Sequence, residues 1–184
     1  MTALIVLAVV VVAALWAVSV YNGLVRRKNV VQEGWSGIDV QLKRRADLIP
    51  NLVETVKGYA SHERGTFDEL TKLRSQTGTQ DIAQRAQTEA AITAAIGKVM
   101  AVAEAYPDLK ASANFQQLQG DLSNIEDQIQ LARRYYNGTV RDYNVAIQQF
   151  PSSLIAGFGG FTAQPFFQID NAVDRDVPKV SFAT

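Results

Sequence analysis

The stretch FQQLQGDLSNIEDQIQLARRYYNGTVRDYNVAIQQF, residues 115–150, has the most regular apolar pattern in this 184-residue chain. Apolar and small side chains recur there at alternating steps of three and four residues. They are Phe115, Leu118, Leu122, Ile125, Ile129, Ala132, Tyr136, Thr139, Tyr143, Ala146 and Phe150. Because this spacing keeps them on one narrow helix face, it predicts a long helix that packs against other helices at shallow crossing angles. Pro151 ends it.

A second stripe with the same steps lies in residues 30–74. Its apolar members are Val31, Trp35, Ile38, Leu42, Ile49, Leu52, Val56 and Tyr59, and Arg45 is its one charged member. The pattern predicts a single helix of about 67 Å. We expect a kink near Pro50, because proline lacks the N–H that would bond the carbonyl of Ala46.

The segment between these stripes, residues 81–105, is alanine-rich. Asp81, followed three residues later by Gln84, resembles a capping-box start, and Pro107 follows its end. A helix of this length covers about 38 Å and is too short to shield both long helices. We therefore expect uncovered apolar seams that contact a second copy of the chain. The alternative is that the C-terminal tail folds back and completes a monomer.

The sequence therefore predicts an all-α protein. It has an N-terminal transmembrane anchor (1–25), an elongated antiparallel, up-down helical bundle with coiled-coil-like packing (26–150), and an irregular aromatic, glycine- and proline-rich tail (151–184). The expected seam and oligomer contacts are Val31, Trp35, Ile38, Leu42, Ile49, Leu52, Val56, Leu118, Leu122, Ile125, Ile129, Tyr136 and Tyr143.

The N-terminus reads as a membrane span, since every residue from Ala3 to Val18 is apolar. Continued through Tyr21, the run reaches about 28 Å, close to the thickness of a bilayer core. Arg26, Arg27 and Lys28 follow it, so the positive-inside rule places the N-terminus outside and the rest in the cytoplasm. A cleaved signal peptide is the alternative, but no positive charge precedes the run. The anchor residues are Ala3, Leu4, Trp16, Tyr21, Arg26, Arg27 and Lys28.

Arg45 lies in a seam, where an unpaired guanidinium is costly, so we expect it to pair with a carboxylate. Glu126 and Asp127 on the third helix are the predicted partners. The alternative is functional: Arg44 and Arg45, beside Asp47, line a surface with Arg133 and Arg134 that binds an acidic partner or anionic lipid.

Five of the eight phenylalanines fall at the start of the tail or directly before it, between positions 150 and 167: Phe150, Phe158, Phe161, Phe166 and Phe167. An up-down-up bundle would end far from its anchored end. We therefore expect these rings to dock on the bundle or on a neighbouring subunit rather than in the protein's own bilayer. A short strand is expected at residues 177–182. The tyrosines of the third helix are expected to pack with satisfied hydroxyls, with a partner-binding ridge as the alternative.

Composition excludes several chemistries. The chain has no cysteine and only one histidine, His62, so it has neither thiolate chemistry nor a multi-histidine metal site. Eighteen basic residues balance eighteen acidic ones, which argues against a nucleic-acid binder. The glycine-rich residues 157–161 lack the Lys-Ser/Thr of a phosphate loop. We predict no cofactor and no enzymatic activity.

Several motifs together resemble the LemA family of bacterial membrane proteins. They are the N-terminal span, the block DVQLKRRADLIPNLV at residues 39–53, Tyr106-Pro107-Asp108-Leu109, Arg134-Tyr135-Tyr136-Asn137, Tyr143-Asn144 and Phe150-Pro151. The resemblance implies a short extracytoplasmic N-terminus, one span and a long antiparallel helical domain. It carries over no catalytic residue. Family members are associated with envelope functions, some lie beside a membrane zinc protease in genomes, and one relative takes part in building magnetosome membranes.

The leading hypothesis is a non-enzymatic scaffold that forms a homo-oligomer, contacts membrane lipid and organises or shapes the bacterial inner membrane. The alternative is an adaptor or regulator of a membrane-protein quality-control protease, which follows from the family context alone.

Overall fold

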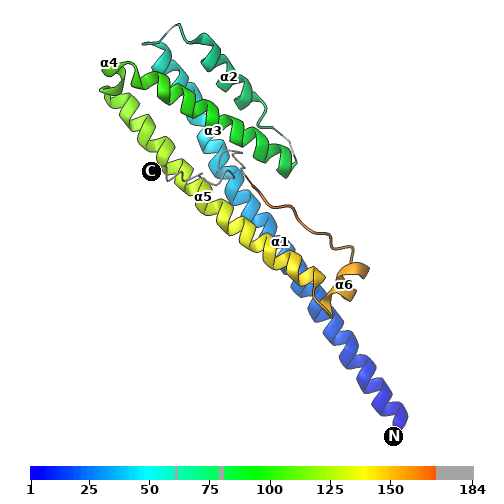
Figure 1. Ribbon diagram of the computed structural model, residues 1–184. Coiled ribbons are helices and arrows are strands. Elements are labelled where there is room, and N and C mark those ends of the chain that lie inside the picture. The colour runs from blue at the N-terminus through cyan, green and yellow to red at the C-terminus, as the bar shows by residue number, and fades with distance from the viewer. Residues whose placement is uncertain (61, 79–80, 169–184) are drawn as a thin grey trace, which may run out of the picture. The chain divides into compact units, whose positions relative to one another are not determined.

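The computed structural model describes residues 1–60, 62–78 and 81–168. This part of the chain forms six helices and no strand (Figure 1). They are α1 (Thr2–Lys57), α2 (Arg64–Ser75), α3 (Ile82–Glu104), α4 (Pro107–Lys110), α5 (Ala113–Gln148) and α6 (Ser152–Phe158). The all-α prediction is confirmed. The strand expected at residues 177–182 lies outside the described residues.

The chain divides into two compact units. Residues 1–40 and 129–166 form the first, which we call the anchor unit. The second, the bundle unit, comprises the described residues of 41–128 together with residues 167 and 168. Both α1 and α5 contribute residues to each unit.

The prediction of one helix over residues 30–74 is wrong, because α1 ends at Lys57 and α2 begins at Arg64. Gly58, a poor helix former, follows the last residue of α1. The amide of Ala60 then donates to the carbonyl of Val56, 2.9 Å away, in a turn that buries Ala60. Beyond this point the apolar stripe fades, so continuing the helix would bury little.

The additional helix α2 changes how the bundle unit is covered. It packs against the alanine-rich α3 and buries Phe67 and Leu70 in the common core. The core also takes apolar side chains from α1, α3, α4 and α5, namely Ile49, Leu52, Val56, Ile92, Ala95, Val99, Ala103, Leu109, Phe115 and Leu122. The short helix α2 thus adds cover to the core that the three-helix interpretation lacked.

The expectation that apolar seams are left uncovered is therefore wrong. On α1, Trp35 is half-buried, and the other seam residues are at most 3% exposed: Val31, Ile38, Leu42, Ile49, Leu52 and Val56. On α5, Leu118 is half-buried, whereas Leu122, Ile125, Ile129, Tyr136 and Tyr143 are buried. These positions are packing contacts within one chain.

Pro50 lies inside α1 without ending it. Its missing N–H leaves the carbonyl of Ala46 without its usual helical partner. The Nε of Arg74 on α2 donates to that carbonyl oxygen at 2.9 Å. A side chain from the element missed by the sequence analysis thus replaces the lost backbone bond.

The helix α3 begins as its sequence predicts. The Oδ1 of Asp81 accepts a hydrogen bond from the amide of Gln84 at 2.8 Å, which satisfies one of the free N–H groups of the first turn. The helix ends at Glu104, and Pro107 then opens the short α4.

In the anchor unit, α1 and α5 approach closely around Gly34. A Cβ built on Gly34 would lie 3.3 Å from the Cα of Tyr136, so the absence of a side chain permits this approach. Beside it, the rings of Trp35 and Tyr136 meet edge to face with centroids 5.7 Å apart. This contact fixes the register of the two helices within the unit.

Candidate functional site

The N-terminal part of α1 presents an unbroken apolar surface. Every residue from Met1 to Trp16 is exposed in the folded chain. Among the described residues, α1 is the one helix long and apolar enough to cross a membrane. A surface of this length favours hydrocarbon over water, since soluble proteins rarely expose an apolar patch this large.

A groove of about 800 Å³ lies in the anchor unit where α1 leaves this exposed stretch. Its lining is apolar at one end and polar and basic further along α1. The lining residues are Leu15, Val18, Ser19, Asn22, Gly23, Arg26, Arg27, Val30, Thr139 and Asp142. Lys28, the third member of the predicted basic cluster, is exposed outside this lining. The groove therefore combines lipid-compatible and anion-attracting surfaces side by side.

The chain that follows α6 is held against α5 by a clamp of two side chains. The Oη of Tyr136 donates to the carbonyl of Pro165 at 2.8 Å. The Nδ2 of Asn144 donates to the carbonyl of Gln164 at 2.9 Å, and the amide of Gln164 donates to the Oδ1 of Asn144 at 2.8 Å. The described part of the tail thus folds back onto its own chain, which was the predicted alternative to contact between subunits.

The two seam tyrosines, Tyr136 and Tyr143, are both buried but differ in the hydrogen bonding of their hydroxyls. Burial raises the pKa of Tyr136 from 10.0 to about 12, and it also raises the pKa of Tyr143. Tyr136 has its clamp bond, whereas the buried hydroxyl of Tyr143 has no hydrogen-bond partner among the described residues. The expectation that these hydroxyls are satisfied therefore holds for Tyr136 and fails for Tyr143.

The tail returns to the anchor. The ring of Phe161 meets the ring of Tyr21 edge to face, with centroids 5.4 Å apart. Gly160 adopts a φ of 67°, and the amide of Phe161 donates back to the carbonyl of Ala156 at 3.0 Å, which closes the end of α6. The expectation that the tail lies far from the anchored end is wrong, because the break after Lys57 adds one reversal and α5 runs back along α1.

The five tail phenylalanines do not all dock. Phe167 is buried and Phe161 is half-buried, but Phe150, Phe158 and Phe166 are exposed. Residues 152–158, which the sequence analysis left irregular, form the helix α6. Because α6 buries Ala156, Leu154 and Phe158 lie on its outer side. Docking on the bundle is thus wrong for Phe150, Phe158 and Phe166 in the described chain.

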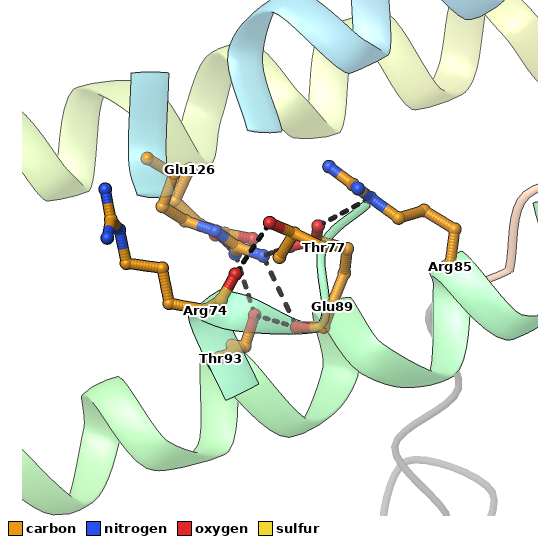
Figure 2. A network of polar contacts seen from close by, with 7 residues as sticks. Arg74, Thr77, Arg85, Glu89, Thr93 and Glu126 are labelled. Atoms are coloured by element: carbon orange, nitrogen blue, oxygen red, sulfur yellow. Dashed lines mark hydrogen bonds and ion pairs between the residues drawn. The ribbon is translucent and has the colours of Figure 1, made fainter. Parts of the chain in front are cut away.

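A buried polar network lies in the bundle unit (Figure 2). Arg45 of α1 is 2% exposed, and its guanidinium reaches Glu89 of α3 and, at 2.9 Å, Glu126 of α5. Its Nη1 also donates to the Oγ1 of Thr93 at 2.8 Å. Arg85 binds the other carboxylate oxygen of Glu89 at 2.8 Å. Two arginines and two glutamates therefore tie three helices together with balanced charge.

The sequence reasoning found part of this network. It named Arg45 and Glu126 but missed Arg85, Glu89 and Thr93 on α3. The available signal was the opposite charges of Arg85 and Glu89 at i and i+4 in the first half of an alanine-rich helix. Asp127, the other predicted partner, is exposed and lies outside the network, and so does the exposed Asp47.

The surface for an acidic partner or anionic lipid was expected to include Arg45, but this residue is buried. Arg45 is buried, whereas Arg44 is exposed and donates to the Oε1 of Gln41 at 3.3 Å. An acidic partner could therefore reach Arg44 but not Arg45. The predicted surface that joins Arg44 and Arg45 is thus wrong as a continuous feature.

An exposed apolar helix that continues into a packed helical bundle defines a membrane-associated all-α protein. A family model supplies the particular family: the chain belongs to the LemA family, whose model matches residues 34–182. The match begins within α1, after its exposed apolar stretch, and covers both the Arg45 network and the clamp.

Curated relatives agree with this assignment. A protein of Metamycoplasma hominis named Protein LemA is 30% identical over 137 residues, which cover 73% of this chain and 63% of that protein. Magnetosome proteins MamQ 1 and MamQ 2 of Paramagnetospirillum magneticum are each 26% identical over 184 aligned positions, covering 85% of this chain and 68% of theirs. This chain thus spans less than two thirds of the mycoplasma relative. None of these names states an enzymatic activity.

Proposed function

We propose that this protein is a non-enzymatic scaffold of the bacterial inner membrane, held there by α1 and able to associate with copies of itself. One observation carries the proposal: the exposed apolar stretch of residues 1–16 belongs to α1, the same helix that supplies Ile49, Leu52 and Val56 to the core of the bundle unit.

The proposed orientation has the N-terminus outside and the bundle in the cytoplasm. It is supported by Arg26, Arg27 and Lys28, which directly follow the apolar run. Because the chain has no cysteine, each single-cysteine variant carries one thiol for labelling, at a known position. On intact spheroplasts, an impermeant maleimide should label Thr2→Cys at once and Lys72→Cys, in α2, only after lysis. The reverse pattern would overturn the orientation.

The absence of catalysis is supported by the nature of the polar network. Its arginines and Glu89 are nearly inaccessible, and its charges neutralise each other within the core. Such an arrangement fits helix registration, because the buried charges are already paired with one another.

Self-association is proposed through the anchor. The seams of α1 and α5 are packed within one chain, so they offer no contact surface. The apolar helix is exposed around its whole circumference at residues 1–16, and spans of this kind associate in membranes by close packing. Light scattering of the detergent-extracted protein tests this. A monomer across the micromolar range would contradict the scaffold.

A further inference from the structure

The segment that follows α5 is uncharged and exposes several large apolar side chains. Residues 143–168 contain no Asp, Glu, Lys, Arg or His. Within them, Phe158 is 93% exposed, Phe150 is 82% exposed and Leu154 is 54% exposed. These three residues follow each other at steps of four, and Leu154 and Phe158 share one side of α6. A folded chain rarely leaves two phenylalanines this exposed to water.

The position of this segment identifies what covers it. The Phe161 ring packs on Tyr21, the last residue of the apolar run, so α6 lies beside α1 where the span ends (Figure 1). On α1, Arg26 and Arg27 follow within two turns and line the groove. Aromatic rings next to basic residues at the end of a span are typical of the membrane–water interface.

The segment is also held firmly in that place. The clamp of Tyr136 and Asn144 binds Gln164 and Pro165, which follow α6 in the chain, to α5. At the N-terminal end of α6, the Ser152 hydroxyl donates to the carbonyls of Ala146 and Gln149, at 2.6 and 2.9 Å. Hydrogen bonds to α5 therefore hold both ends of residues 150–165, a segment that we call the hairpin. It carries the exposed side chains beside the end of the span.

We propose that Phe150, Leu154 and Phe158 insert into the interfacial region of the bilayer, as a second membrane contact beside the span. This inference rests on the proposed membrane anchoring by α1. The occupant is lipid, because the surface lies next to the span and carries no charge, whereas a protein contact would normally include a polar rim. The hairpin then fixes the rotation and tilt of α1, since one helix alone leaves both undetermined.

A fluorescent depth measurement on the full-length protein tests the proposal. Gly157→Cys places a label on α6 without removing an apolar side chain, and a Cβ there meets nothing within 4 Å. Leu7→Cys reports insertion of α1, and Lys72→Cys in the bundle unit is the control. Each variant is labelled with an environment-sensitive dye and reconstituted into phosphatidylcholine–phosphatidylglycerol vesicles. The lipids carry a quencher either near the headgroup or deep in the acyl chain.

We expect the label at residue 157 to be quenched at least about twofold more by the shallow quencher than by the deep one, as for an interfacial helix. The label at residue 7 should show the opposite preference, and the label at residue 72 should show neither. Replacing Phe150, Leu154 and Phe158 together with serine should abolish quenching at residue 157 and leave residue 7 unchanged.

The outcomes separate this inference from the function on which it rests. Quenching at residue 7 without quenching at residue 157 overturns the interfacial contact and leaves the anchor intact. Loss of quenching at both positions overturns both. Quenching at residue 157 that survives the triple serine variant, with its circular dichroism unchanged, also overturns the proposed role of these three side chains. A dye signal at residue 157 that changes with protein concentration, and not with the position of the lipid quencher, assigns the surface to a second copy.

Discussion

Arg45 and Arg44 are neighbours in sequence with opposite environments. Removing the Arg45 side chain leaves the buried Glu89 with Arg85 as its ion-pair partner in the network, and it removes one charge partner of Glu126. We expect Arg45→Ala to lower the free energy of unfolding by about 3 to 5 kcal/mol, as for a broken buried ion pair. Arg44→Ala is the matched control, with an expected change within about 0.5 kcal/mol. Urea titrations followed by circular dichroism measure both, and equal effects would contradict the network's role.

The seam tyrosines form a second matched pair. Tyr136→Phe loses the bond to Pro165, so we expect a cost of about 1 kcal/mol. Tyr143→Phe removes a buried hydroxyl that has no partner among the described residues, so it should be neutral or stabilising. Denaturant midpoints of the two variants give the comparison. A larger loss for Tyr143→Phe would indicate a hidden partner for that hydroxyl.

Tyr136 also predicts a dependence on pH. Its pKa rises from 10.0 to about 12 on folding, so the unfolded chain releases this proton first as the pH increases. The stabilisation is complete below pH 10 and is lost as the pH rises towards 12, by on the order of 2 kcal/mol. The fall should be shallower in Tyr136→Phe. Identical alkaline profiles for the two proteins would show that Tyr136 is not the group responsible.

At the scale of helices, Pro50 and Arg74 predict a coupled pair. Arg74→Ala leaves the Ala46 carbonyl without the donor that replaces the proline's missing N–H, at a cost of about 1 to 2 kcal/mol. In a Pro50→Ala background the backbone can make its own bond, so the same change should cost markedly less. A double-mutant cycle by urea denaturation measures the coupling, and additive effects would show that the two residues act independently.

The helices also show what sequence reasoning could and could not predict. The stripe of residues 115–150 predicted α5 to within two residues at each end, because its period has no interruption. The break after Lys57 was missed, because Gly58 is only a weak signal by itself and the apolar Leu70 resumes the stripe beyond it. The burial of Ala60 and Phe67 decides the turn, and that depends on tertiary contacts with α3. The clamp on α5 was equally out of reach, because its acceptors are backbone carbonyls about 20 to 30 residues away.

For the molecule as a whole, burial of the seams moves the proposed self-association into the membrane. The apolar faces of α1 and α5 are buried within one chain. Copies can therefore contact each other through the anchor or through exposed apolar residues such as Leu131 and Tyr135. We expect a chain that begins at Asn22 to be monomeric by light scattering, while the full-length protein in detergent forms larger particles. The truncated chain should keep its helical circular dichroism, because the core of the bundle unit lies wholly after residue 48.

The control is Leu131→Ser with Tyr135→Ser in the full-length protein, which removes the outer apolar pair on α5 and leaves the anchor intact. It should associate as the unmodified protein does, since spans attract each other through packing inside the lipid. If the truncated chain still associates and the double serine variant does not, the contact lies on α5. The bundle would then assemble side by side at the membrane surface, and the anchor would serve only to concentrate it there.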